Sequence, residues 1–266
     1  MARPFLVLGA PMAGRLAGKV AIVSGGATGM GGASSRLFAA EGAKVAIIDI
    51  NGDAAEETAA LIRSEGGIAQ AFVADVSDEA AVAKAVEGAN AAFGPVTVLF
   101  NHAGTLVVKP FLETTVEEWD WLHAVNVRSM FLMTKAVLPQ MIAAGGGSIV
   151  CTSSISAVAG TPMEVLYDTT KGACHMFARA IAVEFRDRNI RCNALCPGFI
   201  RTPHGLREVD DLNRLGVDVS DAALVAQQGR IGEPEEVAKV ALFLASDEAS
   251  FVNGARLFAD NGFTAA

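Results

Sequence analysis

Seven short runs rich in Val, Ile and Ala alternate along this chain with longer segments of helical periodicity. A mostly apolar run predicts a strand that is buried on both faces, and a helix between successive strands is typical of a parallel sheet. The expected strands cover residues 19–25, 43–50, 68–76, 96–104, 147–154, 190–198 and 255–260. The expected helices cover residues 29–41, 53–65, 78–93, about 115–143 and about 164–187. The sequence therefore predicts an α/β, doubly wound fold with a seven-stranded parallel sheet and helices on both faces.

The domain organisation follows from length and from the absence of a dividing linker. No Pro-, Ser- or Gly-rich linker interrupts the 266 residues, and one α/β domain can fill that length. We expect a single domain over residues 18–266, preceded by an N-terminal extension over 1–17. Its apolar patch is broken by proline and too short for an export signal. The charged, glycine-containing stretch 203–228 is expected to be a surface excursion that serves as a substrate loop or lid.

Composition excludes several classes of protein. Lys and Arg total 21 against 29 Asp and Glu, a net charge of −8, and no basic run could follow a nucleic acid backbone. No apolar run approaches the ~20 residues that cross a bilayer, so a cytoplasmic protein is expected. The four cysteines lack zinc-site spacing, and we expect no metal. The histidines are scattered and are interpreted as incidental: His102, His123, His175 and His204.

A glycine-rich turn follows the first expected strand, where Gly25, Gly29 and Gly31 open a helix. Backbone without Cβ can approach a pyrophosphate, and a helix N-terminus attracts that anion, although small residues also serve plain strand-to-helix packing. The second strand ends at Asp49, where a carboxylate can bind the hydroxyls of an adenosine ribose and repel a 2′-phosphate. The sequence therefore predicts a Rossmann-type dinucleotide site that prefers NAD over NADP.

Tyr167 is the only tyrosine in the chain and lies four residues before Lys171. On a helix the two side chains share a face with Cys174 and Ala178, which makes that face apolar and inward. Because stripping an ammonium group of water is costly, a buried lysine needs a partner. A structural alternative is that Lys171 reaches outward and Tyr167 only packs in the core.

Polar residues elsewhere favour a functional role for this pair. Ser153 and Ser154 end one expected strand, and Asn101 and Gly104 end another. Ligands bind at the carboxyl ends of strands in open parallel sheets. Asn126 lies in a largely apolar helix, where a buried amide needs hydrogen-bond partners. We therefore expect these side chains to converge where the dinucleotide binds.

Together these motifs resemble the short-chain dehydrogenase/reductase family, from about Leu16 to the C-terminus. The resemblance is carried by Ser24-Gly25-x-x-x-Gly29-x-Gly31, Asp75-Val76, Asn101-His102-Ala103-Gly104, Asn126, Ser154, Tyr167-x-x-x-Lys171 and Pro197-Gly198-Phe199-Ile200-Arg201-Thr202. Three positions depart from the family pattern: Ser24 stands for Thr, His102 for Asn, and Asn261 for a glycine of the C-terminal ending.

The resemblance implies that Tyr167 exchanges a proton with the substrate oxygen while hydride passes to or from a nicotinamide. Lys171 would bind the nicotinamide ribose, and its charge is expected to lower the pKa of the phenol by about two to three units before desolvation. Ser154 would bind the substrate oxygen, and Asn126 would hold a water in a proton relay. The implied cofactor contacts are Gly25, Thr28, Gly29, Met30, Gly31, Asp49, Ile50, Asp75, Val76, Asn101, Ala103, Gly104, Tyr167, Lys171, Pro197, Gly198, Ile200 and Thr202.

The leading interpretation is an NAD(H)-dependent oxidoreductase that interconverts a secondary alcohol and a ketone. One alternative is a 3-oxoacyl-[acyl-carrier-protein] reductase, which would usually need NADPH and a basic docking patch. Another is a non-catalytic dinucleotide sensor or scaffold, which would be expected to lose the catalytic residues. Glu164 could bind a polyol, or could only complement the helix dipole. The candidate substrate contacts are Thr105, Ser154, Ile155, Glu164 and Phe199.

The resemblance also implies assembly, because relatives pair the two long helices into dimers and commonly tetramers. We expect a homotetramer or a homodimer. Small residues would allow close helix contact between copies, and would equally suit packing within one chain: Gly172, Ala173, Ala180 and Ala182.

Overall fold

The computed structural model describes residues 14–265 and confirms the predicted parallel sheet. Its strands are β1 Val20–Ser24, β2 Lys44–Asp49, β3 Ile68–Val73, β4 Val98–Asn101, β5 Gly147–Thr152, β6 Ile190–Pro197 and β7 Arg256–Ala259. They lie in the order β3-β2-β1-β4-β5-β6-β7, and every neighbouring pair is parallel. The direction of winding reverses between β1 and β4, and such a switch point opens a crevice at the carboxyl ends of the strands.

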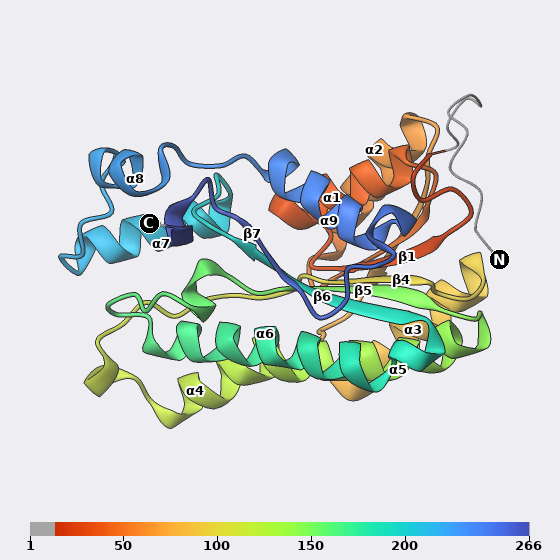
Figure 1. Cartoon of the computed structure of the whole chain (residues 1–266), viewed down its shortest axis with the longest axis horizontal. Coiled ribbons are helices and arrows are strands. Elements are labelled where there is room, and N and C mark those ends of the chain that lie inside the picture. Colours follow the sequence, from red (N-terminus) through yellow and green to blue (C-terminus); the bar gives the residue numbers. More distant parts are fainter. Residues whose placement is uncertain (1–13, 266) are drawn as a thin grey trace.

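Helices cover both faces of the sheet (Figure 1). They are α1 Gly29–Ala40, α2 Gly52–Ser64, α3 Glu79–Phe93, α4 Val116–His123, α5 Ser129–Ala143, α6 Val165–Glu184, α7 Pro203–Arg214, α8 Asp221–Gln228 and α9 Pro234–Ala245. On one face α1, α2 and α9 pack on a core that includes Phe38 and Phe100. On the other, α3, α5 and α6 pack on a core that includes Met133 and Met141. Within residues 14–265, no helix has both the length and the apolar character needed to cross a membrane.

Two segments differ from their predicted form. The long helix expected over 115–143 is interrupted by a π-helical turn, Ala124–Arg128, between α4 and α5. The excursion 203–228 is mostly helical, because Thr202 caps α7, Pro203 opens it, and Ser220 caps α8. The high charge of α7 hid its periodicity, since only a few apolar residues mark its inner face. In Figure 1 α7 and α8 lie beyond the carboxyl ends of the strands.

Residues 14–17, placed by the sequence prediction in the N-terminal extension, pack against the domain. Leu16 is fully buried and its amide donates to the Glu41 carbonyl (2.9 Å). The Arg15 amide donates to Glu41 Oε2 (2.7 Å). The rest of the predicted extension, residues 1–13, lies outside the described residues.

Candidate active site

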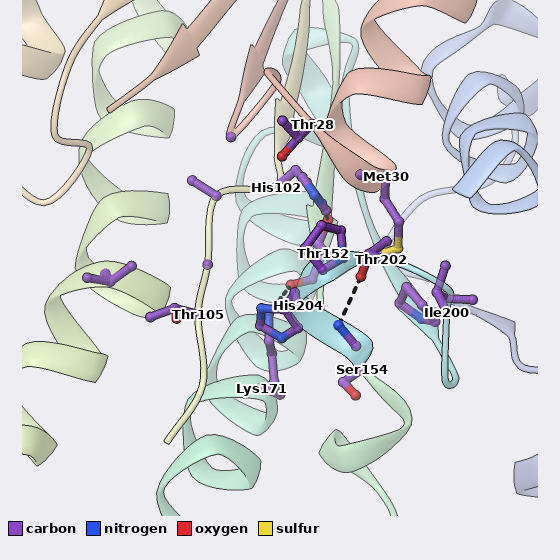
Figure 2. Close-up of a pocket in the computed structure, with 18 of the residues that line it drawn as sticks. Thr28, Met30, His102, Thr105, Thr152, Ser154, Lys171, Ile200, Thr202 and His204 are labelled. Atoms are coloured by element: carbon purple, nitrogen blue, oxygen red, sulfur yellow. Dashed lines mark hydrogen bonds between the residues drawn. The ribbon is translucent and has the colours of Figure 1, made fainter. Parts of the chain in front are cut away.

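A cleft of about 440 Å³ opens at the carboxyl ends of the strands. Figure 2 shows Thr28 and Met30 toward one end of it and Lys171 and Ser154 toward the other. Most of the predicted cofactor residues line this cleft, namely Gly25, Thr28, Gly29, Met30, Asp49, Ile50, Asp75, Val76, Ala103, Gly104, Tyr167, Lys171, Pro197, Gly198, Ile200 and Thr202. Four of the five candidate substrate contacts line it too: Thr105, Ser154, Ile155 and Phe199.

Four predicted site residues do not line the cleft: Gly31, Asn101, Asn126 and Glu164. Gly31 packs directly against the Gly25 carbonyl, where no Cβ would fit. Asn101 Nδ2 donates to Thr134 Oγ1 (2.9 Å) and so anchors the end of β4 to α5. These two residues shape the cleft from behind its surface.

The turn between β1 and α1 can hold an anion. Gly25 has a φ of +64°, and a Cβ there would lie 2.8 Å from Ala103 Cα, so glycine is required. No side chain within residues 14–265 caps the N-terminus of α1 at Thr28. Its first N–H groups therefore stay available to a ligand, which fits the pyrophosphate of a dinucleotide.

Asp49 is held at the end of β2 by two backbone groups. Its Oδ2 accepts from the Ala27 amide (3.1 Å) and its Oδ1 from the Asn51 amide (3.0 Å). Each oxygen retains a lone pair for a further donor. Among the residues that line the cleft, Lys171 is the only Lys or Arg, and it lies at the opposite end. The end of the cleft at Thr28 and Asp49, called the nucleotide end below, therefore offers an acceptor for ribose hydroxyls and no cation that could bind a 2′-phosphate.

Ser24 and Asn261, two positions that depart from the family pattern, both make specific contacts. The Ser24 hydroxyl accepts from the amides of His102 (3.0 Å) and Ala103 (3.2 Å), which joins the carboxyl ends of β1 and β4. Asn261 adopts a φ of +49°, a conformation that Asn tolerates, and its Nδ2 donates to the Gln228 carbonyl. Both side chains therefore bind backbone groups of a neighbouring segment.

His102 lines the cleft, whereas the sequence analysis interpreted it as incidental. Its Nδ1 lies 3.0 Å from Thr152 Oγ1. Burial lowers the pKa of His102 to about 3, and the charges of Lys171 and His204 act in the same direction. The imidazole is therefore neutral at neutral pH. Its place in the Asn-His-Ala-Gly motif was the signal that could have identified it.

Tyr167 and Lys171 lie one turn apart on α6, and both are buried, with 7% and 5% of their surface exposed. Lys171 Nζ lies 5.5 Å from the centroid of the Tyr167 ring and donates to the Thr152 carbonyl (3.2 Å). Cys174 on the same face is fully buried, as the predicted inward face requires. Burial lowers the pKa of Lys171.

The pKa of Tyr167 is raised well above its usual value, chiefly by burial and then by the charges of Glu208 and Glu164. A hydrogen bond with Ser154 opposes this rise. The sequence predicted only the charge effect of Lys171 before desolvation, and the net shift in this structure is upward. Desolvation of a phenolate, together with two carboxyl groups that the sequence did not bring close, outweighs one neighbouring ammonium.

Ser154 follows β5 in an extended conformation and begins the short helical turn 155–157. Its Oγ accepts from the Ser156 amide (3.1 Å) and lies 3.1 Å from Ser156 Oγ. These contacts fix the rotamer of a hydroxyl that lines the cleft. Ser153, the other serine at this strand end, instead donates its hydroxyl to the Lys171 carbonyl (2.9 Å) and supports α6.

Asn126 lies in the π-helical turn, a feature that is frequent at functional sites. Its Oδ1 accepts from the Thr105 amide (2.8 Å), and its Nδ2 donates to the Thr105 carbonyl (2.8 Å) and to Thr170 Oγ1 (3.0 Å). A Cβ at Gly104 would lie 3.2 Å from Asn126 Oδ1 and 3.5 Å from Lys171 Nζ. Both side chains therefore approach the same point beside Gly104.

The end of the cleft at Lys171 and Ser154 is called the catalytic end below. Helix α7 brings to it two residues, His204 and Glu208, that the sequence analysis did not identify as site residues. The His204 ring lies 6.3 Å from the Tyr167 ring, and burial lowers the pKa of His204 to about 4. Burial raises the pKa of Glu208 to about 7, against the opposing charge of Lys171. The four-residue spacing of His204 and Glu208 would place both side chains on one face of a helix, but the segment was interpreted as a loop.

Glu164, a predicted substrate contact, is fully buried behind the cleft. Neither carboxyl oxygen has a hydrogen-bond partner among residues 14–265. Burial raises the pKa of Glu164 to about 9, and the charges of Glu208 and Asp168 act in the same direction. Glu164 is therefore a neutral carboxylic acid at neutral pH, and it does not act as a charge at the N-terminus of α6.

Comparison with known proteins identifies the family. A family model described as enoyl-(acyl carrier protein) reductase matches residues 25–264. The chain is 39% identical over 253 residues to a 2,5-dichloro-2,5-cyclohexadiene-1,4-diol dehydrogenase of Sphingobium indicum, covering 95% of this chain and 99% of that protein. It is 40% identical over 252 residues to a cyclopentanol dehydrogenase of Comamonas sp., covering 95% of this chain and 99% of that protein. The chain belongs to the short-chain dehydrogenase/reductase family.

Solved structures agree with this short-chain dehydrogenase/reductase over nearly its whole length. Levodione reductase superimposes with a TM-score of 0.90 at 31% identity, covering 94% of this chain and 99% of that chain. A gluconate 5-dehydrogenase from Burkholderia cenocepacia, solved with NADP and tartrate, superimposes with a TM-score of 0.86 at 33% identity, covering 96% and 98%. The fold is therefore that of a family of dehydrogenases and reductases.

Proposed function

We propose that this short-chain dehydrogenase/reductase interconverts a secondary alcohol and a ketone with NAD(H). The main support is the buried Tyr167 and Lys171 at one end of a cleft whose other end carries Asp49. The hydroxyl of Ser154 lines the same end as Tyr167. Two similar proteins are named for oxidation of a cyclic alcohol and of a cyclic diol, which supports substrates of this class.

The preference for NAD is supported by the charges at the nucleotide end. A 2′-phosphate would meet the carboxylate of Asp49, and none of the residues lining that end is a Lys or Arg. The gluconate 5-dehydrogenase that resembles this chain was solved with NADP, so a direct comparison of the two cofactors is the decisive measurement. Tighter binding of NADP(H) than of NAD(H) would contradict the preference.

In the mechanism, the bound nicotinamide supplies the hydride acceptor or donor. The hydroxyl of Ser154 holds the substrate oxygen, and Tyr167 Oη takes the alcohol proton, with the Lys171 ammonium stabilising the phenolate. The same group returns the proton in ketone reduction. Both Nδ2 hydrogens of Asn126 are engaged, so a relay water would bind the remaining lone pair of Asn126 Oδ1, beside Lys171.

The test of this function is Tyr167→Phe, which removes one oxygen and keeps the packing. Turnover of a secondary alcohol should fall about 10²- to 10⁴-fold, because the proton acceptor is lost. Binding of NADH, followed by its fluorescence, should be unchanged, and circular dichroism should show the native fold. Near-normal turnover by the variant would refute the role of Tyr167.

The two alternatives from the sequence predict different results in the same assays. A 3-oxoacyl-[acyl-carrier-protein] reductase would reduce an acyl-carrier-protein substrate with NADPH much faster than it oxidises free alcohols. A non-catalytic sensor would bind NAD(H) and turn over no alcohol or ketone in a broad panel. Activity on small secondary alcohols with NAD would exclude both.

We further propose assembly into a homodimer or homotetramer through α5 and α6. Apolar side chains on these helices are exposed, among them Phe131, Met176 and Val183. Of the small residues on α6, Ala180 is exposed, whereas Ala182 is buried in the chain's own core. Sedimentation that shows only monomers at micromolar concentration would contradict this proposal.

A further inference from the structure

Helix α7 turns a polar face toward the catalytic end of the cleft. His204 and Glu208 are one helical turn apart and both line the cleft, and Leu212, one turn further, is fully buried. These three positions share the inward face of the helix. The face that closes over Tyr167 therefore carries a carboxyl group and an imidazole where apolar side chains would suffice for packing.

The Glu208 carboxyl has no partner within the described chain. Among residues 14–265 it accepts no hydrogen bond and forms no ion pair, although Lys171 and Arg207 are close enough to act on it by charge. Arg207 instead donates to Thr105 Oγ1 (3.2 Å) on the opposite wall. Behind the cleft, the charge of Glu208 acts on the unpartnered Glu164. The carboxyl lines the cleft without a partner in the described chain, so it is available to a group that binds in the cleft.

The surroundings of Glu208 define the chemistry of that group. Apolar side chains line the same cleft and suit a hydrocarbon skeleton: Trp121, Val125, Ile155 and Phe199. Ser154 and Tyr167 bind the reacting oxygen at one point, so Glu208 offers a second polar point on the substrate. A hydroxyl group can donate to a carboxylate and accept from a carboxylic acid, so it fits either form of Glu208. A cationic group would meet repulsion from Lys171 and Arg207.

We propose that Glu208, together with His204, binds a second hydroxyl group of the substrate, so that the enzyme selects diols over the corresponding mono-alcohols. This proposal depends on the proposed oxidation of secondary alcohols and specifies its substrate class. Glu208 is then a specificity-determining residue, and the proton transfer stays with Tyr167.

The experiment compares cyclohexanol with cyclohexane-1,2-, 1,3- and 1,4-diol as substrates with NAD. For wild-type enzyme, kcat/KM for the best diol should exceed that for cyclohexanol by roughly 10- to 100-fold, the usual value of a hydrogen bond to a charged group. Glu208→Met should remove this preference, because KM should rise for the diols and much less for cyclohexanol. Loss of the Glu208 charge also acts on Tyr167, so any change in kcat should be shared by both substrates and cancel in their ratio. Glu208→Gln, which still donates and accepts, should restore most of the preference.

Asp210→Met is the matched control, because Asp210 is exposed on the same helix. It should leave both substrates unaffected. An equal loss on cyclohexanol and diols in Glu208→Met would assign Glu208 a structural role and overturn the proposal. Wild-type enzyme that oxidises cyclohexanol as well as any diol would overturn the proposal alone. Preference for trans-2-aminocyclohexanol would identify a cation site instead, and turnover of none of these compounds, with NADH still bound, would overturn the proposed function as well.

Discussion

The two ends of the cleft satisfy their polar groups in opposite ways. At the nucleotide end, Asp49 accepts hydrogen bonds from Ala27 and Asn51, and Asp75 accepts from Ser77, so each carboxylate is held by backbone groups. At the catalytic end, Glu164 and Glu208 have no hydrogen-bond partner among residues 14–265, and burial raises the pKa of both. The carboxylates of the nucleotide end are thus held in place before a ligand binds, whereas at the catalytic end the fully buried carboxyl of Glu164 is unpaired at a cost in stability.

The largest expected effect tests whether the catalytic end depends on one positioned hydroxyl. Ser154→Ala should lower kcat about 10²- to 10³-fold, because the developing charge on the substrate oxygen loses a donor. Steady-state kinetics would measure it. Ser156→Ala is the comparison: it removes one contact of the Ser154 hydroxyl but keeps the Ser156 amide that donates to Ser154 Oγ, and Ser156 does not line the cleft, so its loss of kcat should be much smaller. If both variants lose kcat equally, the loss reflects the local structure at the end of β5 and not a hydrogen bond from the Ser154 hydroxyl to the substrate.

A smaller effect is expected at the nucleotide end. Asp49→Asn should weaken NAD(H) binding about 10- to 100-fold, because a charged acceptor for the ribose hydroxyls is lost. NADP(H) should gain relative to NAD(H), since the repulsion of its 2′-phosphate disappears. Titration of reduced cofactor fluorescence measures both affinities, and Asp53→Asn, on the exposed first turn of α2, is the control. An unchanged ratio of the two affinities would mean that Asp49 does not choose the cofactor.

The smallest effect concerns the stability cost at the catalytic end. The pKa of Glu164 is about 9 in the folded protein and about 4.5 when exposed. Below about pH 4.5 Glu164 is protonated in both the folded and the unfolded protein. Between about pH 4.5 and pH 9 only the unfolded protein releases this proton, so the folded protein loses stability as the pH rises through this range. Glu164→Gln removes this loss, and its stability relative to wild type should grow by about 1–2 kcal/mol between about pH 5 and pH 6.

Thermal melts across this pH range would measure the change as a gain of about 2–8 °C in Tm relative to wild type. Glu57→Gln, on the exposed face of α2, should show no such gain. If the Tm of Glu164→Gln and the Tm of wild type changed with pH in parallel, Glu164 would be ionised or exposed in the folded protein. The contrast between the two ends of the cleft would then weaken.

The residues of the nucleotide end and the tyrosine–lysine pair could be predicted from the sequence, whereas the residues that α7 brings to the catalytic end could not. The glycines after β1, Asp49 at the end of β2 and the spacing of Tyr167 and Lys171 are local patterns, in which a few neighbouring residues fix both conformation and chemistry. His204 and Glu208 lie in a charged segment whose helix could not be recognised, so their approach to Tyr167 could not be predicted. The net pKa of Tyr167 could not be predicted either, because it depends first on burial and then on the charges of Glu208, which comes from α7, and of Glu164.

The sequence by itself determined the parallel α/β fold, the dinucleotide turn and the tyrosine–lysine pair, because strand and helix periods, glycine conformation and one-turn spacing act over a few residues. Only the tertiary structure decided the electrostatics of the catalytic end. Desolvation and charge–charge interaction depend on which segments meet in space, and here the start of α6 and the inner face of α7 bring Glu164 and Glu208 close enough for their charges to act on the buried phenol of Tyr167.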